Sequence, residues 1–172
     1  MISNKRTTIE GWIDKASNQL QAAKEHSKFP TQYSEAIQAA QECVELSVKS
    51  ILSLLDVTFL PSHGWEQDKK PFTAIAEQIQ KKQLINKLTA HYLNHIVNLP
   101  RLLFLVNFWA QFYTTAKYGF EAGYLASAKD LFKKEEAELA IQHAQECYQA
   151  ASQLRYLSKD KMDALLSSGE SG

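Results

Sequence analysis

The segment 31–56 constrains the fold more than any other part of the sequence, because it is apolar around much of a helical circumference. One stripe of apolar side chains recurs every three or four residues, at Tyr33, Ile37, Ala40, Val44, Val48, Ile51 and Leu55. A second, flanking stripe consists of Ala36, Ala39, Cys43, Leu46 and Leu54. A helix with so wide an apolar face must be covered by more than one partner. The pattern therefore predicts a central helix.

The composition favours helices elsewhere too. Only six Gly and four Pro occur among 172 residues, of which 45% are hydrophobic. A chain of this length can bury one good core, so we expect a single domain over residues 1–166, followed by a disordered tail at 167–172. Cys43 and Cys147 both fall in apolar helical patterns and are expected to be buried and reduced.

The balance of charge excludes some functions. Lys and Arg number 19, as do Asp and Glu, so the global field gives no reason for nonspecific attachment to nucleic acid or membranes, although local patches stay open. The longest apolar run, at 102–113, is interrupted by Asn107 and Gln111 and is too short to span a bilayer. With no signal peptide in evidence, we expect a soluble, cytoplasmic protein without a membrane partner.

Similar periodicity recurs along the rest of the chain. Further helices are expected at 7–28, 71–84, 85–97, 100–116 and 133–154, with a short helical turn at 160–166. The polar stretch at 78–83 leaves open a bend or an end of the second of these before Leu84. The first should begin at the capping-box spacing of Thr7 and Glu10. Together these patterns predict an all-α protein, an up-and-down four-helix bundle with additional short helices.

Aromatic residues crowd the later part of the chain. They nearly surround the helix expected at 100–116, which is therefore either deeply buried or used on one face for association. The segment 117–131 is expected to be an extended, ordered connection in which Tyr118, Phe120 and Tyr124 plug into the core.

Several motifs, taken in order, resemble the HEPN domain family. The first is an Ala-rich helix with a Gln, then Val-Glu, then a Lys four residues beyond the Glu, here Ala40, Gln41, Val44, Glu45 and Lys49. The second is a His in the following loop, His63. The third is an aromatic-rich connection into an Ala-rich last helix, at 118–151.

The resemblance implies a bundle that commonly forms homodimers and is associated with nucleotides, RNA or nucleotidyltransferase partners. Many members of the family are ribonucleases with an Arg followed four to six residues later by a His. This sequence departs from that pattern, since none of Arg6, Arg101 and Arg155 is followed in this way. Lys117 stands where many relatives carry an Arg before a Tyr-Gly segment. The nuclease activity is therefore not carried over.

Four residues are candidate ligand contacts: Lys49, His63, Lys117 and Tyr118. Each also has a structural interpretation. Lys49 is spaced for a solvated ion pair with Glu45, His63 for a hydrogen bond that caps the central helix, and a lone Lys is most often a solvated charge.

His91 and His95 have the spacing of two metal ligands on one helical face. No third ligand follows them, so two partly exposed polar histidines are the default and no metal site is predicted. The sequence also lacks a Gly-rich phosphate loop, a Cys-x-x-Cys motif and a nucleophile elbow, and no cofactor is expected.

The leading hypothesis is a noncatalytic HEPN-like module that forms a homodimer through an apolar helix face and binds a nucleotide, RNA or a nucleotidyltransferase-type partner. Two alternatives stay open. One is a divergent, metal-independent ribonuclease of toxin–antitoxin type that uses His63 or His91 with a Lys. The other is a purely structural protein-interaction module.

Overall fold

The computed structural model describes residues 2–59, 70–121 and 124–167. Helices account for most of them, in the order α1 (Ile2–His26), the 3-10 helix η1 (Pro30–Gln32), α2 (Tyr33–Leu54), α3 (Lys70–Lys81), α4 (Leu84–Ala90), α5 (Leu99–Ala110), α6 (Tyr113–Tyr118), α7 (Ala128–Leu131), α8 (Lys134–Arg155) and α9 (Lys159–Leu166). Between these described residues, β-type pairing is confined to one isolated bridge, from Phe120 to Ala126. The protein is all-α, as predicted.

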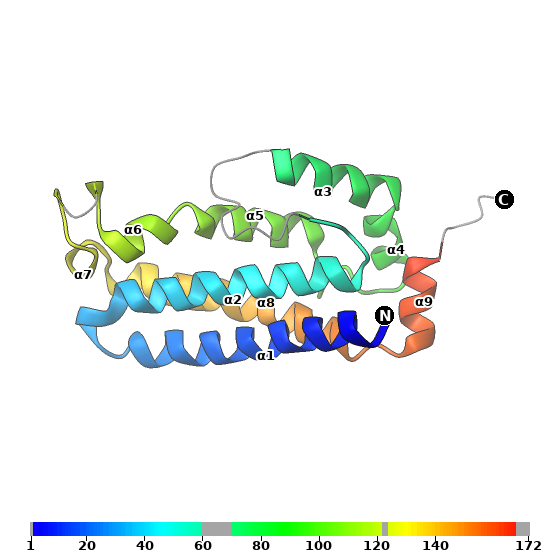
Figure 1. Ribbon diagram of the computed structural model, residues 1–172, viewed down its shortest axis with the longest axis horizontal. Helices are drawn as coiled ribbons and strands as arrows, with labels where there is room; N and C mark the ends of the chain where they lie inside the picture. Colours follow the sequence, from blue (N-terminus) through cyan, green and yellow to red (C-terminus); the bar gives the residue numbers. More distant parts are fainter. Residues whose placement is uncertain (1, 60–69, 122–123, 168–172) are drawn as a thin grey trace.

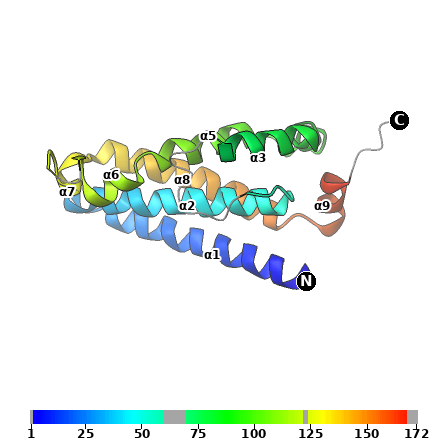
Figure 2. The ribbon, with the colours of Figure 1, turned by 45° about the horizontal axis from the view of Figure 1, so that its top comes forward.

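Four rods make up the bundle. Figure 1 shows α1 and α2 running side by side in opposite directions, α5 followed by α6 returning along them, and α8 running back beside α2. Helices α3 and α4 lie at the end where α2 finishes, and α9 closes that same end (Figures 1 and 2). The up-and-down four-helix bundle with additional short helices is therefore confirmed.

Helix α2 is the centre of the core, as its two apolar stripes predict. It packs most extensively against α1 and α8, and also against α5 and α6. Ile37, Val44, Val48 and Ile51 are all buried. Since four partners share one helix, most of its circumference is removed from water.

Small residues bring α2 and α8 close together. Ala36 and Ala40 on α2 and Ala140 and Ala144 on α8 are buried without measurable exposure. The Cys43 thiol lies 3.6 Å from the carbonyl oxygen of Ala144. Cys43 and Cys147 are both buried and free, which confirms the prediction, and burial raises the pKa of the Cys43 thiol to about 12.

The helix boundaries differ most from the sequence-based prediction at three places. Helix α1 begins at Ile2, not Thr7, and the Glu10 carboxylate accepts a hydrogen bond from Arg6 Nε at 3.2 Å. The helix expected at 100–116 is two helices, α5 and α6, because the chain turns after Ala110 and the Phe112 amide bonds to the Trp109 carbonyl. The helix expected at 85–97 ends at Ala90.

No helix among residues 2–59, 70–121 and 124–167 combines the length and apolar character needed to cross a bilayer. The single-domain assignment for residues 1–166 stays a prediction. The tail expected to be disordered lies, from residue 168 onward, outside the described residues.

Candidate functional site

Lys49 is buried inside the bundle, in an ion pair with the partly buried Glu45. Its side chain is 7% exposed and that of Glu45 15% exposed, and Lys49 Nζ donates to Glu45 Oε1 at 2.5 Å. Gln41 Nε2 donates to the other oxygen of the same carboxylate at 3.2 Å. The pair is therefore buried, which corrects the expectation of a solvated one. The Lys49 ammonium group is already paired with Glu45 of the same helix. A ligand contact by Lys49 stays a prediction.

Lys117 and Tyr118 come together with Tyr113 at the other end of the molecule. Lys117 Nζ lies 5.6 Å from the centroid of the Tyr113 ring and 5.3 Å from that of Tyr118. The Tyr118 side chain is 55% exposed. We call Tyr113, Lys117 and Tyr118 the α6 patch. Hydrogen bonding to Tyr118, and then to Tyr113, raises the pKa of Lys117, so its positive charge is secure at neutral pH.

The chain after α6 adds more exposed aromatic surface. Gly119 ends the helix at a φ of 88°, a conformation that favours glycine, and the Phe120 amide then bonds to the Ala126 carbonyl at 3.0 Å. Phe120 is 47% exposed and Tyr124 93% exposed. The prediction that the aromatics of this segment plug into the core is therefore wrong. Helix α7 then lies back against the bundle, where it contacts α2, α6 and η1.

The remaining predicted site residues are histidines. His63 lies outside the described residues. His91 and His95 are exposed and follow the end of α4, with Tyr92 between them at a φ of 57°, so the prediction that they share one helical face is wrong. Within the described part of the chain, no three His, Cys, Asp or Glu side chains are grouped to hold a metal ion.

The structure also assembles a polar cluster that the sequence did not reveal, between α5 and α8. Trp109 Nε1 donates to His143 Nδ1 at 3.1 Å, so the neutral imidazole carries its proton on Nε2. Beside them, Arg101 binds Glu146 through both carboxylate oxygens, with Nη2 at 2.9 Å from Oε2. Burial, followed by the charge of Arg101, lowers the pKa of His143. This cluster therefore joins α5 to α8 with a neutral histidine.

His143 should make the stability of the fold depend on pH. Because its pKa is lowered in the folded protein, its contribution to stability is complete above the unfolded pKa of about 6.5 and is lost as the pH falls towards the folded pKa. His143→Gln keeps a side-chain acceptor for Trp109 but does not titrate. We therefore expect the free energy of unfolding of this variant to fall less than that of the wild type between pH 7.5 and 5.5. Urea titrations at each pH measure these free energies. An equal fall in the variant and in the wild type would contradict this role.

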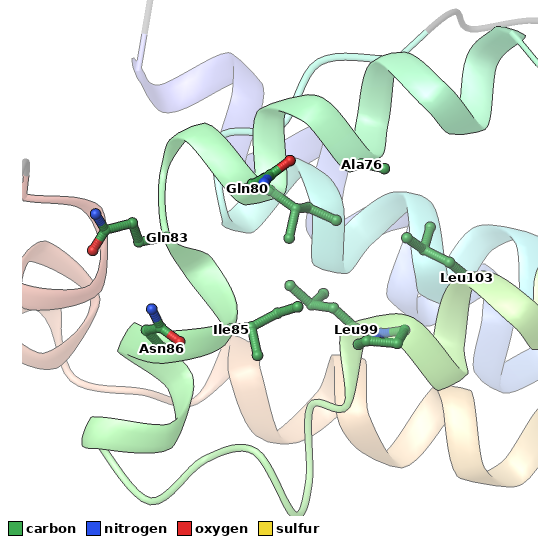
Figure 3. A pocket seen from close by; sticks show the side chains of 9 residues that line it. Ala76, Gln80, Gln83, Ile85, Asn86, Leu99 and Leu103 are labelled. Carbon is green, nitrogen blue, oxygen red and sulfur yellow. The ribbon is translucent and has the colours of Figure 1, made fainter.

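An apolar groove of about 450 Å³ lies between α3, α4 and α5. Figure 3 shows Ile85 and Leu99 close together in it, with Leu103 to one side and Gln83 and Asn86 to the other. The groove is lined by Ala76, Ile79, Gln80, Gln83, Ile85, Asn86, Leu99, Pro100 and Leu103, none of which is charged. Periodicity identified several of these residues as apolar, but it did not show that three separate helices bring them together.

Comparison with known proteins identifies the family. The family model for the HEPN domain matches residues 9–154, which is most of the chain. No curated protein and no solved structure matches the chain. The matched region runs from α1 to the end of α8 and includes the Glu45–Lys49 pair and the α6 patch. The chain therefore belongs to the HEPN domain family.

Proposed function

We propose that this HEPN-domain protein is a noncatalytic module that binds single-stranded RNA through the α6 patch. Family membership associates the chain with nucleotide- and RNA-related functions or with toxin–antitoxin modules, and the chemistry of the patch supports RNA binding among these. One observation supports the proposal most. Lys117 Nζ lies 5.6 Å from the centroid of the exposed Tyr113 ring and 5.3 Å from that of the exposed Tyr118 ring.

The chemistry of the patch suits a nucleic-acid strand. A base can stack on an exposed aromatic ring whatever its identity, and a lysine beside the ring neutralises the neighbouring phosphate. Phe120 and Tyr124, both exposed, extend the aromatic surface beyond Tyr118. The patch therefore offers stacking surfaces and a positive charge close together.

Binding is favoured over cleavage by the residue types present. A metal-independent ribonuclease needs a proton-transfer group beside a cation that stabilises the developing charge on phosphorus. The α6 patch supplies a cation and two tyrosines but no histidine, the side chain whose ordinary pKa best suits proton transfer at neutral pH. His91, the described histidine of the ribonuclease alternative, lies just beyond α4, which Figure 1 places at the opposite end of the bundle from α6.

Tyr118→Ala and Lys117→Gln test the proposal. Removing the Tyr118 ring should weaken binding of a labelled single-stranded RNA about tenfold, because stacking contributes about 1–3 kcal/mol per base. Removing the Lys117 charge should reduce the slope of log K against log salt by about 0.7, the value for one phosphate contact on a single strand. Fluorescence anisotropy at several salt concentrations measures both effects.

The control is Lys161→Gln, an exposed lysine on α9 at the far end of the bundle. This variant should bind RNA as the wild type does. RNA binding that is unchanged in both α6 variants, or absent in the wild type, would refute the proposed function. Cleavage of the labelled RNA that survives repeated purification would refute its noncatalytic part.

A specific surface supports a second proposed property, the formation of a homodimer through α5. Phe104 is 58% exposed and stacks on Phe108 at a centroid distance of 5.9 Å. On the same helix, Leu99, Pro100 and Leu103 line the apolar groove. A two-fold interface uses one patch on both subunits, so the patch must contain a projection and a recess. The exposed Phe104 ring and the neighbouring groove meet this requirement.

The charges on α5 are compatible with this pairing. Arg101 is the one charged residue between Leu99 and Ala110, and it is neutralised by Glu146 of its own chain. Two copies can therefore meet across α5 without repulsion between like charges. A nucleotidyltransferase-type partner with an apolar helix is the alternative occupant of the groove.

Phe104→Asp is expected to convert a dimer to a monomer, since it places a carboxylate in an apolar contact. Sedimentation velocity at micromolar protein concentrations measures the change. Leu139→Asp, which alters a leucine on α8 that is 41% exposed, serves as the control and should leave the dimer intact. A wild-type protein that is monomeric at these concentrations would exclude the homodimer.

A further inference from the structure

A second pocket, of about 480 Å³, lies at the end of the bundle opposite the α6 patch. It forms where α2 and α9 finish and where α3 meets α4, at the end that α9 closes in Figure 1. Its lining residues are Asp56, Gln78, Lys81, Lys82, Gln83, Leu84, Lys87, Leu165 and Leu166. Three lysines thus line one pocket, although they come from segments on both sides of the α3–α4 turn.

The hydrogen bonds of these lysines leave their positive charges largely uncompensated. Lys82 Nζ donates to the main-chain carbonyl of Asp56, and Lys87 Nζ donates to the carbonyl of Ser167 at 2.7 Å. A carbonyl is a neutral acceptor, so neither bond cancels the charge. The Lys81 ammonium group has no hydrogen bond or ion pair to any residue that the structure describes.

Asp56 is the one acidic residue of the lining, and it is already shared between two cations. Its carboxylate lies 2.9 Å from Lys5 Nζ and 3.7 Å from Lys82 Nζ. Hydrogen bonding from Lys5 lowers the pKa of Asp56, which is therefore ionised at neutral pH. Three lysines and one carboxylate line the pocket, so its lining carries a net positive charge.

The partial charges of the helix ends at the pocket do not cancel its net positive charge. Helices α2, α3 and α9 finish there, and the end of a helix carries a partial negative charge of roughly half a unit. Each lysine that binds a carbonyl near such an end carries a full positive charge. Since a partial charge offsets only part of a full one, the pocket stays attractive to an anion.

We propose that this pocket binds a phosphate-bearing anion. The lysine ammonium groups would contact the phosphate oxygens, while Leu165, Leu166 and the amide of Gln83 would face the remainder of the ligand. Phosphate is the shared chemistry of a free nucleoside polyphosphate and of the 5′ end of an RNA. This site is separate from the α6 patch, and it does not depend on RNA binding there.

The test begins with calorimetric titration of the full chain with sodium tripolyphosphate, ATP and adenosine. We expect saturable binding of tripolyphosphate and ATP that weakens as salt is raised, and no binding of adenosine. Lys81→Gln should lower the affinity for both anions about tenfold, because a charge-assisted hydrogen bond is lost. Lys81→Arg should retain most of the affinity. Because the Lys81 ammonium group forms no hydrogen bond or ion pair within the described structure, neither variant should alter thermal unfolding.

Two controls separate this site from the proposed RNA surface. Lys117→Gln should leave the affinity for tripolyphosphate unchanged, and so should Lys161→Gln. Comparing a short RNA with a 5′-triphosphate and the same RNA with a 5′-hydroxyl, both in the Lys117→Gln background, distinguishes an RNA end from a free nucleotide. The inference is overturned if neither anion binds, if Lys81→Gln binds both as tightly as the wild type, or if adenosine binds as well as ATP.

Discussion

Replacement of Lys49 by methionine is expected to lower the free energy of unfolding by about 3–5 kcal/mol, one of the two largest effects predicted for a single substitution here. Lys49 and Glu45 are 7% and 15% exposed, and their charged atoms are 2.5 Å apart. Methionine fills a similar volume but removes the buried ammonium group that pairs with the Glu45 carboxylate. Urea denaturation followed by circular dichroism measures the loss.

The double variant Glu45→Leu with Lys49→Met is the matched control. Removing both charges removes the need to compensate either one, and buried ion pairs replaced in this way often cost little stability. The double variant should therefore be more stable than Lys49→Met alone. If Lys49→Met were as stable as the wild type, the carboxylate would have access to water and the pair would not be buried.

Leu52→Ala is expected to lower the free energy of unfolding by about 2–5 kcal/mol, because it opens a cavity in a core that contains α2. Leu52 has no exposed surface and belongs to the buried apolar cluster. Leu139→Ala makes the same chemical change at a position on α8 that is 41% exposed, and it should cost about 0.5 kcal/mol or less. Similar losses from both variants would contradict the central position of α2.

Much of the fold could be predicted because helical periodicity is a local property. Both apolar stripes of α2 fall between Tyr33 and Leu55, and together they required packing partners on several sides of the helix. The break between α5 and α6 could not be predicted in this way, since Gln111 and Phe112 are neither Gly nor Pro. It follows from how the aromatic side chains pack after Trp109, where Phe112 contacts both Phe108 and Trp109.

The candidate sites also differ in whether their residues are neighbours in the sequence or are brought together only by the fold. Lys117 and Tyr118 are neighbours in the sequence, so a resemblance and a local pattern could identify them. In the sequence, the three lysines of the second pocket are only two neighbours, Lys81 and Lys82, and a later residue, Lys87. That they meet Asp56 and α9 depends on the turn at Gln83, which has a φ of 51°. The bond between Trp109 and His143 joins positions 34 residues apart, a contact that no local pattern contains.

An NMR titration of the labelled protein with a short single-stranded RNA tests the proposed function most directly. The account predicts saturable shifts of the amide signals at residues 113–120, with the Lys117 and Tyr118 signals among the most affected. It also predicts that replacing Tyr118 by alanine raises about tenfold the RNA concentration at which these shifts are half-saturated. Saturable shifts that cluster elsewhere on the bundle and leave α6 unperturbed would contradict it.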